Sequence, residues 1–530
     1  MMHAKQTKST IIETPLEHMW DRKDVMLVAS GSLPCIRAIW FRARSAGKLH
    51  QYRYLAMTNS NYVLGDAEDV IKEGMIEAAS VENVAMVVLF LSCPDILIRI
   101  DFDDIERTVS EETGKIAKVF FRGPMAGLDK IKRDTVADLM ALLPKEEKEI
   151  LRGNEPLPPP LSDAFGVSDL IRFDRSANLV LTPRGCRSCM EEGDMLHGGN
   201  VYATEMEEKD FVFGPEETAG EDARMLAKDY ETIYLIGTAV PAFLNFNPDF
   251  VRTEVGEEKL LLYFPTDGFH DAFIGVSRAE LILLRNAGNK RKTGKKRQVL
   301  LAGYSPLLSG DLHQFNRAKK FLEDEGYTLS VPGMTELSPE DTLLVWVVSA
   351  AGFPIANWME KTYGTPVLTS MPLGDHAFES WQKKVKFLLA QKSGREATVI
   401  HNMMMTHTRK ESVLITGDPV VSMGIAYYLW HEGFSNIKIA VPCWGRETKQ
   451  LCKEAPGWDD WMVSFRMRRE LMPLWQEADL VIADSYLTEV LPDRATMPLP
   501  YGLISGRDGW FDGVLSPKWE KDLQSVLNRL

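Results

Sequence analysis

Short apolar runs alternate with amphipathic stretches along almost the whole chain from Asp24 onward. Apolar runs of about four to eight residues are typical of buried strands, whereas apolar residues that recur every three or four positions are typical of helices. Their alternation predicts β-α-β units and parallel sheets. In the first part of the chain we expect strands at 26–29, 84–91 and 117–121, and helices at 67–79, 104–113 and 135–143.

The same alternation continues through the second half of the chain. The predicted fold class is therefore α/β, with several Rossmann-like parallel-sheet units. In this half we expect strands at 298–304, 342–348, 367–370, 412–415, 437–441 and 479–483, and helices at 311–326, 355–363, 420–432 and 458–477.

An internal repeat links residues 35–123 to residues 186–268. In each copy a cysteine is followed by a glycine, a proline and a second glycine, and each interval is two residues shorter in the second copy. A repeat in register predicts that the N-terminal unit is duplicated. The anchors are Cys35, Gly65, Pro94 and Gly123 in the first copy and Cys186, Gly214, Pro241 and Gly268 in the second.

These patterns divide the chain into six segments. The segments are an N-terminal arm at 1–23, the first N-terminal unit at 24–145, a proline-rich linker at 146–165, the second N-terminal unit with a basic linker at 166–297, a second Rossmann-like domain at 298–403 and a third at 404–530.

Composition narrows the class of protein. A net charge of −14 argues against a nucleic-acid surface, and the basic run at 285–297 is interpreted as a solvated linker. The apolar stretch at 84–100 is interrupted by Pro94, Asp95 and Arg99, so we expect no membrane span. The first 25 residues contain no apolar core of a secretory signal, which predicts a cytoplasmic protein.

Four of the six cysteines form a candidate metal site. Cys35 and Cys93 each follow a predicted strand of the first copy, whereas the second copy has Cys186 and Cys189, with Val240 in the place of Cys93. Four thiolates are the usual ligands of a [4Fe–4S] cluster, and they satisfy zinc equally well. Unrelated buried thiols are the other alternative.

A set of short motifs carries a family resemblance. They are Pro34-Cys35, Gly65 and Gly214 as expected strand ends, Ser92-Cys93-Pro94, Gly185-Cys186, Pro265-Thr266-Asp267-Gly268-Phe269, Gly303-Tyr304, Tyr363-Gly364-Thr365-Pro366 and Gly417-Asp418-Pro419. In their order and spacing the chain resembles nitrogenase component 1 and its relatives, which include light-independent protochlorophyllide reductase and nickel-sirohydrochlorin reductive cyclase. The resemblance covers nearly everything after Asp24.

The resemblance implies an oxidoreductase component whose cysteine-bearing turns hold an iron–sulfur cluster between two related units. It also implies that no FeMo-type cofactor is present, because residues 343–349 lack the cysteine and the chain after His431 lacks the histidine that hold it. An organic substrate or an unanchored cofactor is therefore expected in place of dinitrogen. A scaffold for iron–sulfur or metallocofactor assembly is the alternative, and a binding protein without metal is a third possibility.

The resemblance further implies a separate ATP-dependent reductase with its own [4Fe–4S] cluster, similar to the nitrogenase iron protein, since the chain has no phosphate-binding loop motif. A homodimer or a sister component-1 subunit is also possible. A substrate pocket is expected between the loops at 303–311, 371–376 and 417–421. His270 is a candidate proton donor, with a solvated loop histidine as the alternative, and Cys443 and Cys452 are expected to be structural.

Overall fold

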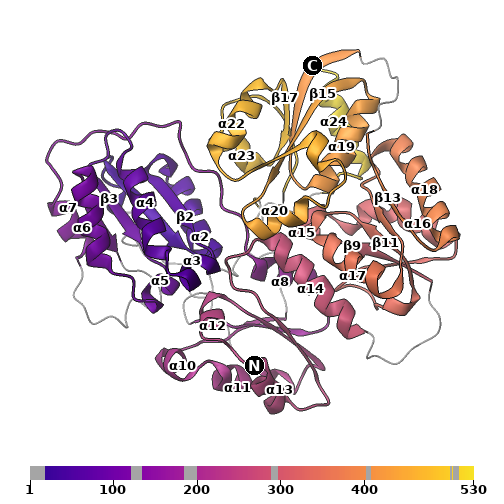
Figure 1. Cartoon of the computed structure of the whole chain (residues 1–530), viewed down its shortest axis with the longest axis horizontal. Coiled ribbons are helices and arrows are strands. Elements are labelled where there is room, and N and C mark those ends of the chain that lie inside the picture. Colours follow the sequence, from indigo (N-terminus) through magenta and orange to yellow (C-terminus); the bar gives the residue numbers. More distant parts are fainter. Residues whose placement is uncertain are drawn as a thin grey trace. The chain divides into compact units, whose positions relative to one another are not determined.

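Four parallel sheets run through the part of the chain that the structure describes. The computed structural model describes residues 18–120, 134–172, 174–183, 200–287, 297–400, 408–501, 504 and 512–530. Every pairing between strands in these ranges is parallel, as Figure 1 allows the reader to follow. The predicted α/β class with Rossmann-like units is therefore confirmed.

The sheets follow one another along the chain. The first has the order β2 (Tyr52–Ala56), β1 (Val25–Gly31), β3 (Met86–Phe90), β4 (Ile116–Phe120). The second has the order β6 (Val201–Ala203), β5 (Ala177–Val180), β7 (Thr232–Ile236), β8 (Leu260–Phe264). The third has the order β10 (Thr328–Ser330), β9 (Gln298–Ala302), β11 (Thr342–Val347), β12 (Val367–Thr369), β13 (Arg395–Ala397). The fourth has the order β16 (Met462–Phe465), β15 (Phe434–Pro442), β14 (Arg409–Thr416), β17 (Leu480–Ala483), β18 (Ala495–Pro498).

Helices connect these strands. With the first sheet lie α2 (Leu33–Ser45), α3 (Asn59–Leu64), α4 (Ala67–Ala79), α5 (Cys93–Leu97), α6 (Phe102–Thr113) and α7 (Val136–Ala141). With the second lie α8 (Asp163–Ile171), α10 (Glu208–Phe213), α11 (Glu216–Leu226), α12 (Ala239–Phe243), α13 (Pro248–Val255) and α14 (Ala272–Ala287). With the third lie α15 (Pro306–Ser309), α16 (Asn316–Asp324), α17 (Phe353–Tyr363) and α18 (Gly374–Gln391). With the fourth lie α19 (Pro419–His431), α20 (Arg446–Cys452), α21 (Trp458–Trp461), α22 (Arg468–Glu477), α23 (Ser485–Val490) and α24 (Pro517–Leu527). Short 3-10 turns occur at Leu49–Gln51, Leu312–Phe315, Pro339–Asp341 and Ala350–Gly352.

Two local predictions were wrong. The helix expected at 458–477 is interrupted, because Met462–Phe465 forms the edge strand β16, which pairs with the end of β15. Gly65 and Gly214 do not end strands. They end the short helices α3 and α10, where their positive φ angles of 80° and 96° close the helix.

The first two sheets have the same topology. Their orders, β2-β1-β3-β4 and β6-β5-β7-β8, become identical when β1 is matched with β5. The helices between the strands also correspond, since a short helix ends at Gly65 or Gly214 and another contains Pro94 or Pro241. This agreement is consistent with a duplicated N-terminal unit.

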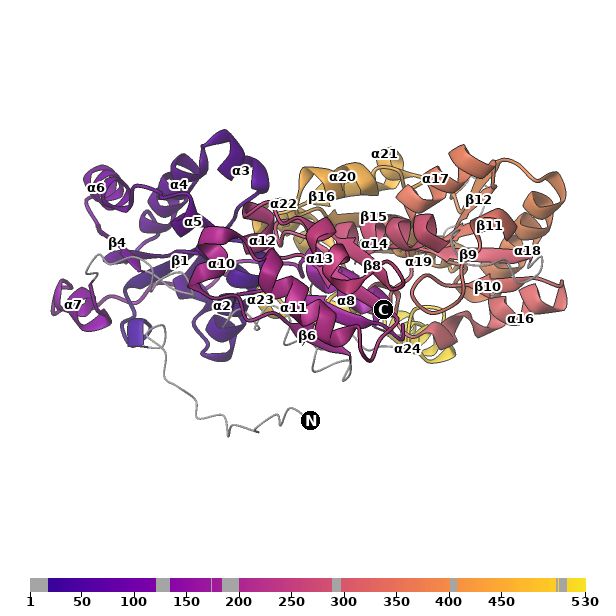
Figure 2. The ribbon, with the colours of Figure 1, turned by 90° about the horizontal axis from the view of Figure 1, so that it is seen from below.

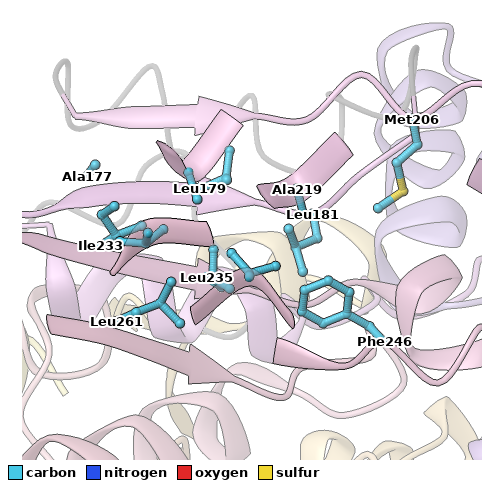
Figure 3. Packing of buried hydrophobic residues seen from close by; sticks show 12 residues of the cluster. Ala177, Leu179, Leu181, Met206, Ala219, Ile233, Leu235, Phe246 and Leu261 are labelled. Carbon is cyan, nitrogen blue, oxygen red and sulfur yellow. The ribbon is translucent and has the colours of Figure 1, made fainter. Parts of the chain in front are cut away.

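The chain divides into two compact units, Met1–Pro156 and Leu157–Leu530. The first sheet belongs to the first unit, and the other three sheets belong to the second. Part of the core of the second unit lies between the second sheet and helices α11 and α13, and Figure 3 shows its side chains. Among the described residues, no helix has the length and apolar character needed to cross a membrane.

Helices α8 and α14, both labelled in Figure 2, are in close contact within the second unit. A Cβ atom added at Gly275 would lie 2.0 Å from the carbonyl oxygen of Asp163, and one added at Gly166 would lie 2.3 Å from that of Ala272. The crossing therefore requires glycine on both helices. Because α14 also contacts α17 and α20, this pair of helices joins the second sheet to the two later domains.

Candidate functional site

Cys35 and Cys93 lie on two touching turns at one edge of the first sheet. Cys35 is in the first turn of α2, which follows β1, and Cys93 is the first residue of α5, which follows β3. β1 and β3 are neighbouring strands. A Cβ atom at Gly31 would lie 2.4 Å from that of Ser92, so the two turns are in direct contact. Neither cysteine is part of a disulfide, and Cys93 is buried whereas Cys35 is partly exposed.

A buried carboxylate holds these two turns together. Asp95 Oδ2 accepts hydrogen bonds from the Ser30 hydroxyl at 2.7 Å and from the Ser92 N–H and hydroxyl at 2.8 and 2.7 Å. Its Oδ1 accepts a bond from the Tyr62 hydroxyl at 2.8 Å. Burial raises the pKa of Asp95, against the lowering effect of these donors. The network fixes the ends of β1 and β3 from which the cysteine turns start.

Sequence reasoning missed Asp95, although a pattern that points to it was present. Ser92 and Asp95 form a capping box at the start of α5, in which each side chain bonds the backbone of the other. A serine followed three residues later by an acidic residue is a recognised start of a helix.

The second pair of candidate ligands, Cys186 and Cys189, lies outside the described residues. The position that matches Cys93 in the second copy is Val240, which is buried in α12. The four-cysteine site remains a prediction.

His270 lies in a network of charged side chains before α14. Its Nδ1 is 2.9 Å from Asp267 Oδ1 and 4.0 Å from Asp163 Oδ2, and its Nε2 is 3.3 Å from Glu447 Oε1. Burial alone would lower the pKa of His270, but the hydrogen bond and charge of Asp267 outweigh it and raise this pKa to about 9. His270 therefore carries a positive charge at neutral pH. Its use as a proton donor remains a prediction.

Asp163, Asp267 and His270 also have ligand atoms within 4.8 Å of one another, as a metal site would require. However, both oxygens of Asp163 already accept backbone N–H bonds from the loop, at 3.0 and 2.9 Å. Arg278 brings a further cation, with Nη1 3.9 Å from Asp163 and Nη2 3.2 Å from Glu447. The carboxylates thus already face protein cations, and the cluster is an ion network that joins the loop before α14 to α20.

Buried carboxylates tie down the loops that follow the strands of the later domains. Each accepts a backbone N–H from a strand-end loop or an adjacent segment. Burial raises the pKa of Asp169, of Glu280 and of Asp418. The pairs are Asp169 with Leu307, Glu280 with Gly303, Asp418 with Ala350 and Asp484 with Tyr501, at 3.0, 2.7, 2.8 and 2.9 Å.

Two of the three loops expected to form a substrate pocket line a small cavity. The cavity has a volume of about 10 Å³, which is the space of roughly one water molecule. The loop at 371–376 does not contribute to it, because Met371 packs against Gly424 of α19. The lining residues are Leu308, Ser309, Asp418, Val421, Leu499, Pro500, Tyr501 and Val514.

A larger hollow of about 350 Å³ lies over one face of the second sheet. It is lined by residues of β7, β8, the end of α14 and the loop at 333–337, and the Tyr234 hydroxyl donates to Asp174 at 2.6 Å beside it. This hollow is built from other loops than those expected to bind substrate.

Cys443 and Cys452 lie together, which the sequence did not indicate. Both are buried, and the neighbouring Cys443 side chain together with burial raises the pKa of Cys452 well above its usual range. Their expected structural role is compatible with this packing.

Comparisons with known proteins agree with this architecture. A family model described as nitrogenase component 1 type oxidoreductase matches residues 170–499. The solved structure titled "Nitrogenase Cp1 at pH 6.5" is 13% identical, with 74% of this chain and 96% of that chain covered and a TM-score of 0.52. A second structure, "Nitrogenase Cp1 at pH 5", is 14% identical, with 71% and 92% covered and a TM-score of 0.44. No curated protein matched the sequence.

At 13% identity the first of these structures shows a shared fold alone. The family model goes further, because it spans more than half of the chain and covers the second sheet and most of the two later domains. The first sheet, at the N-terminal end, lies before the matched region. The predicted resemblance is confirmed, and the chain belongs to the family of nitrogenase component 1 type oxidoreductases.

Proposed function

We propose that this protein passes low-potential electrons through an iron–sulfur cluster to a bound organic substrate or cofactor. The observation that carries the proposal is the contact between the Cys35 and Cys93 turns. Asp95 holds both turns by accepting hydrogen bonds from Ser30 and Ser92. Two thiolates on adjacent, braced turns suit a rigid inorganic cluster, because ligand geometry must be held by the surrounding hydrogen bonds. A [4Fe–4S] cluster supplies one-electron transfer at low potential when it is bound.

The remaining ligands in this proposal are Cys186 and Cys189. Family membership supports an iron–sulfur cofactor shared between two related units. The matching topology of the first two sheets supports the same arrangement, since each copy then supplies a cysteine turn from an equivalent strand end. The cluster site is completed in one of three ways: by the second copy in the same chain, by the second chain of a homodimer, or by a sister subunit.

The substrate in this proposal is not dinitrogen. Residues 343–349 contain no cysteine, and no histidine follows His431, so the chain lacks the residue types expected to anchor a FeMo-type cofactor. The strand-end loops of the third and fourth sheets are the proposed binding region. They would have to move apart to admit an organic substrate, because the cavity beside Ser309, Asp418 and Tyr501 has the space of roughly one water molecule.

The electron source in this proposal is a separate ATP-dependent reductase that carries its own [4Fe–4S] cluster. Each of the two units has an exposed apolar helix end that supports contact with such a partner. Val63 and Leu64 at the end of α3 are each 76% exposed, and Val212 and Phe213 at the end of α10 are 70% and 87% exposed. Adjacent exposed apolar side chains mark candidate contact sites for a partner, and each copy has such a pair at the end of a short helix. A reducing cytoplasm, which keeps thiols reduced, fits the proposed use of the cysteines as cluster ligands.

The test is anaerobic purification of the full chain, with iron and sulfide analysis and electron paramagnetic resonance after reduction. Stoichiometric iron and sulfide with a paramagnetic reduced state is the expected result. Cys35→Ser and Cys93→Ser are expected to lose most of the iron, whereas the matched variant Cys443→Ser retains it. A metal-free or zinc-only wild-type protein would remove the redox proposal.

A further inference from the structure

The hollow of about 350 Å³ over the second sheet takes no part in the proposed function. Its volume falls within the range of roughly 300–1,000 Å³ that is usual for small-molecule sites in proteins. Asp174 precedes β5 and Leu260 begins β8, so the hollow lies toward the edge at which the strands of the second sheet begin. Its lining residues include none of those around the small cavity beside Asp418. The hollow is therefore a separate candidate site.

The floor of the hollow is part of the hydrophobic core. Tyr234, Leu262 and Leu283 line it, and they belong to the buried cluster between the second sheet and helices α8 and α14. Leu260 and Leu337 also line it, and they pack against this cluster while staying partly buried. An apolar ligand resting here would cover apolar surface that the fold leaves in contact with water, which favours binding.

One wall of the hollow is the loop at 333–337, which follows β10 and is fixed by its own contacts. The Thr335 hydroxyl accepts the Val331 N–H at 2.8 Å. A Cβ atom added at Gly333 would lie 2.2 Å from the Leu170 carbonyl oxygen, so the loop touches α8 directly. Because the core fixes the floor and these contacts fix the wall, the hollow is formed before a ligand arrives.

The charged group that a ligand in the hollow would meet is the half-buried carboxylate of Asp174. The Tyr234 hydroxyl donates to its Oδ2 at 2.6 Å and so orients it. Burial and the negative charge of Asp174 raise the pKa of Tyr234, which therefore stays a neutral donor. The other two charged lining residues, Arg175 and Glu336, are exposed and of opposite sign. The hollow thus offers one oriented negative charge beside an apolar floor.

An anion or a bare metal ion is a poorer occupant of this hollow. The Asp174 carboxylate would repel an anion. Within the described ranges, the group of three close ligand atoms is Asp163, Asp267 and His270, and none of these residues lines the hollow. An ammonium group on an apolar body matches both features, because it makes a charge-assisted hydrogen bond to the carboxylate while its body covers the leucines.

We propose that this hollow binds a small organic cation, an amine whose ammonium group pairs with Asp174 and whose apolar body lies on Leu260, Leu262 and Leu283. The bound amine would touch both the second sheet and the loop at 333–337, and so it would link these two parts of the second unit. Binding is reversible and changes no covalent bond. The proposed iron–sulfur cluster has no part in it, so this site stands or falls independently of the cluster.

The test titrates the full chain with phenethylammonium and measures binding by isothermal titration calorimetry. Phenethyl alcohol and phenylacetate carry the same ring with a neutral or a negative group in place of the ammonium. We expect a dissociation constant of about 1 mM or lower for the ammonium probe. Binding of the other two probes is expected to be weaker by about tenfold or more, since the charge-assisted hydrogen bond is lost.

Two variants locate the site. Asp174→Asn keeps the size of the side chain and removes its charge, so we expect phenethylammonium to bind no more tightly than phenethyl alcohol. Ala287→Trp fills the hollow from the last turn of α14 and is expected to abolish binding of all three probes. The matched control is Asp249→Asn in α13, which removes a carboxylate that does not line the hollow and is expected to bind as wild type does.

Equal affinity of the wild-type protein for the three probes, or no binding up to about 10 mM, would overturn the proposal. Binding that both Asp174→Asn and Ala287→Trp leave unchanged would place the amine elsewhere and would overturn it as well. If Asp174→Asn fails to fold, as shown by circular dichroism, the probe series on wild type and the Ala287→Trp variant still decide.

Discussion

Asp418 accepts a hydrogen bond from the Ala350 backbone N–H at 2.8 Å, and this bond joins the start of α19 to the loop after β11. The other oxygen of Asp418 accepts the N–H groups of Val420 and Val421 at 2.8 and 3.0 Å. Burial raises the pKa of Asp418 to about 6, against the lowering effect of these three donors. One carboxylate thus caps a helix of the last domain and fastens it to the domain before.

The first prediction concerns this carboxylate. Both oxygens of Asp418 accept backbone N–H groups. In Asp418→Asn one oxygen is replaced by an amide nitrogen, which then faces the N–H of Ala350 or those of the first turn of α19 and cannot accept them. Leaving a buried donor unmet costs about 1–3 kcal/mol, so we expect the urea midpoint of the second unit to fall accordingly. Asp311→Asn, at a part-exposed cap, is the matched control and is expected to cost less. Equal losses in the two variants would contradict this account.

The second prediction concerns the crossing of α8 and α14. Gly275→Ala places a methyl group 2.0 Å from the Asp163 carbonyl oxygen, so the helices must move apart. Overpacking of this kind costs about 1–3 kcal/mol, measured as a lower unfolding midpoint of the second unit. Gly445→Ala is the control, because a Cβ atom there meets nothing within 4 Å. A Gly275→Ala variant as stable as this control would show that the helices are not in the described contact.

The third prediction concerns pH. The pKa of His270 is about 9 in the folded protein, above its ordinary value of 6.5. A raised pKa means that the stabilising contribution is complete below pH 6.5 and is lost as the pH rises through about 9. The unfolding midpoint of wild type is therefore expected to fall across this window relative to that of His270→Gln. The exposed residue His313 provides the control variant His313→Gln, and an identical pH profile for all three proteins would refute the network.

The fourth prediction concerns the exposed apolar helix ends. Leu64→Asp and Phe213→Asp each place a charge on one of the exposed apolar helix ends, and we expect electron transfer from the ATP-dependent reductase to slow by about tenfold or more, as for a hot-spot residue. Stopped-flow absorbance of the reduced reductase measures the rate, and iron content is expected to stay unchanged. Leu142→Asp and Phe250→Asp alter other exposed residues and serve as controls. Full-rate substrate reduction by dithionite alone would remove the partner from the mechanism.

The parallel sheets were predictable because the alternation of apolar runs and helical stretches is a local property of the sequence. The strand β16 was not, because Met462–Phe465 acquires its partner from β15 in the folded chain, and its spacing alone fits a helix. The helices before Gly65 and Gly214 were missed for a different reason. Their apolar residues favour strands, whereas the capping boxes at Thr58 and Glu207 favour the start of a helix. Both segments are helical in the structure.

The candidate site was predictable in the same uneven way. Parallel strand ends meet at one edge, so neighbouring positions for the Cys35 and Cys93 turns followed from the sequence. The proximity of Cys443 and Cys452 depends on the path of α20. The charged network around His270 includes Asp163, which lies more than a hundred positions earlier in the sequence. Such meetings depend on packing between distant segments, which no local pattern records.

Helix α8 is buried along its whole length, and its partner α14 begins only at Ala272, roughly 100 residues later in the chain. At ribosomal speeds of roughly 5–20 residues per second, α8 leaves the ribosome several seconds before α14 exists to cover it. The segment Asp163–Ile171 is therefore exposed to solvent in every nascent chain, although it is buried in the folded protein. Chaperones that bind apolar segments during translation are expected to bind this segment. Production of the protein in a foreign host is therefore expected to depend on such chaperones.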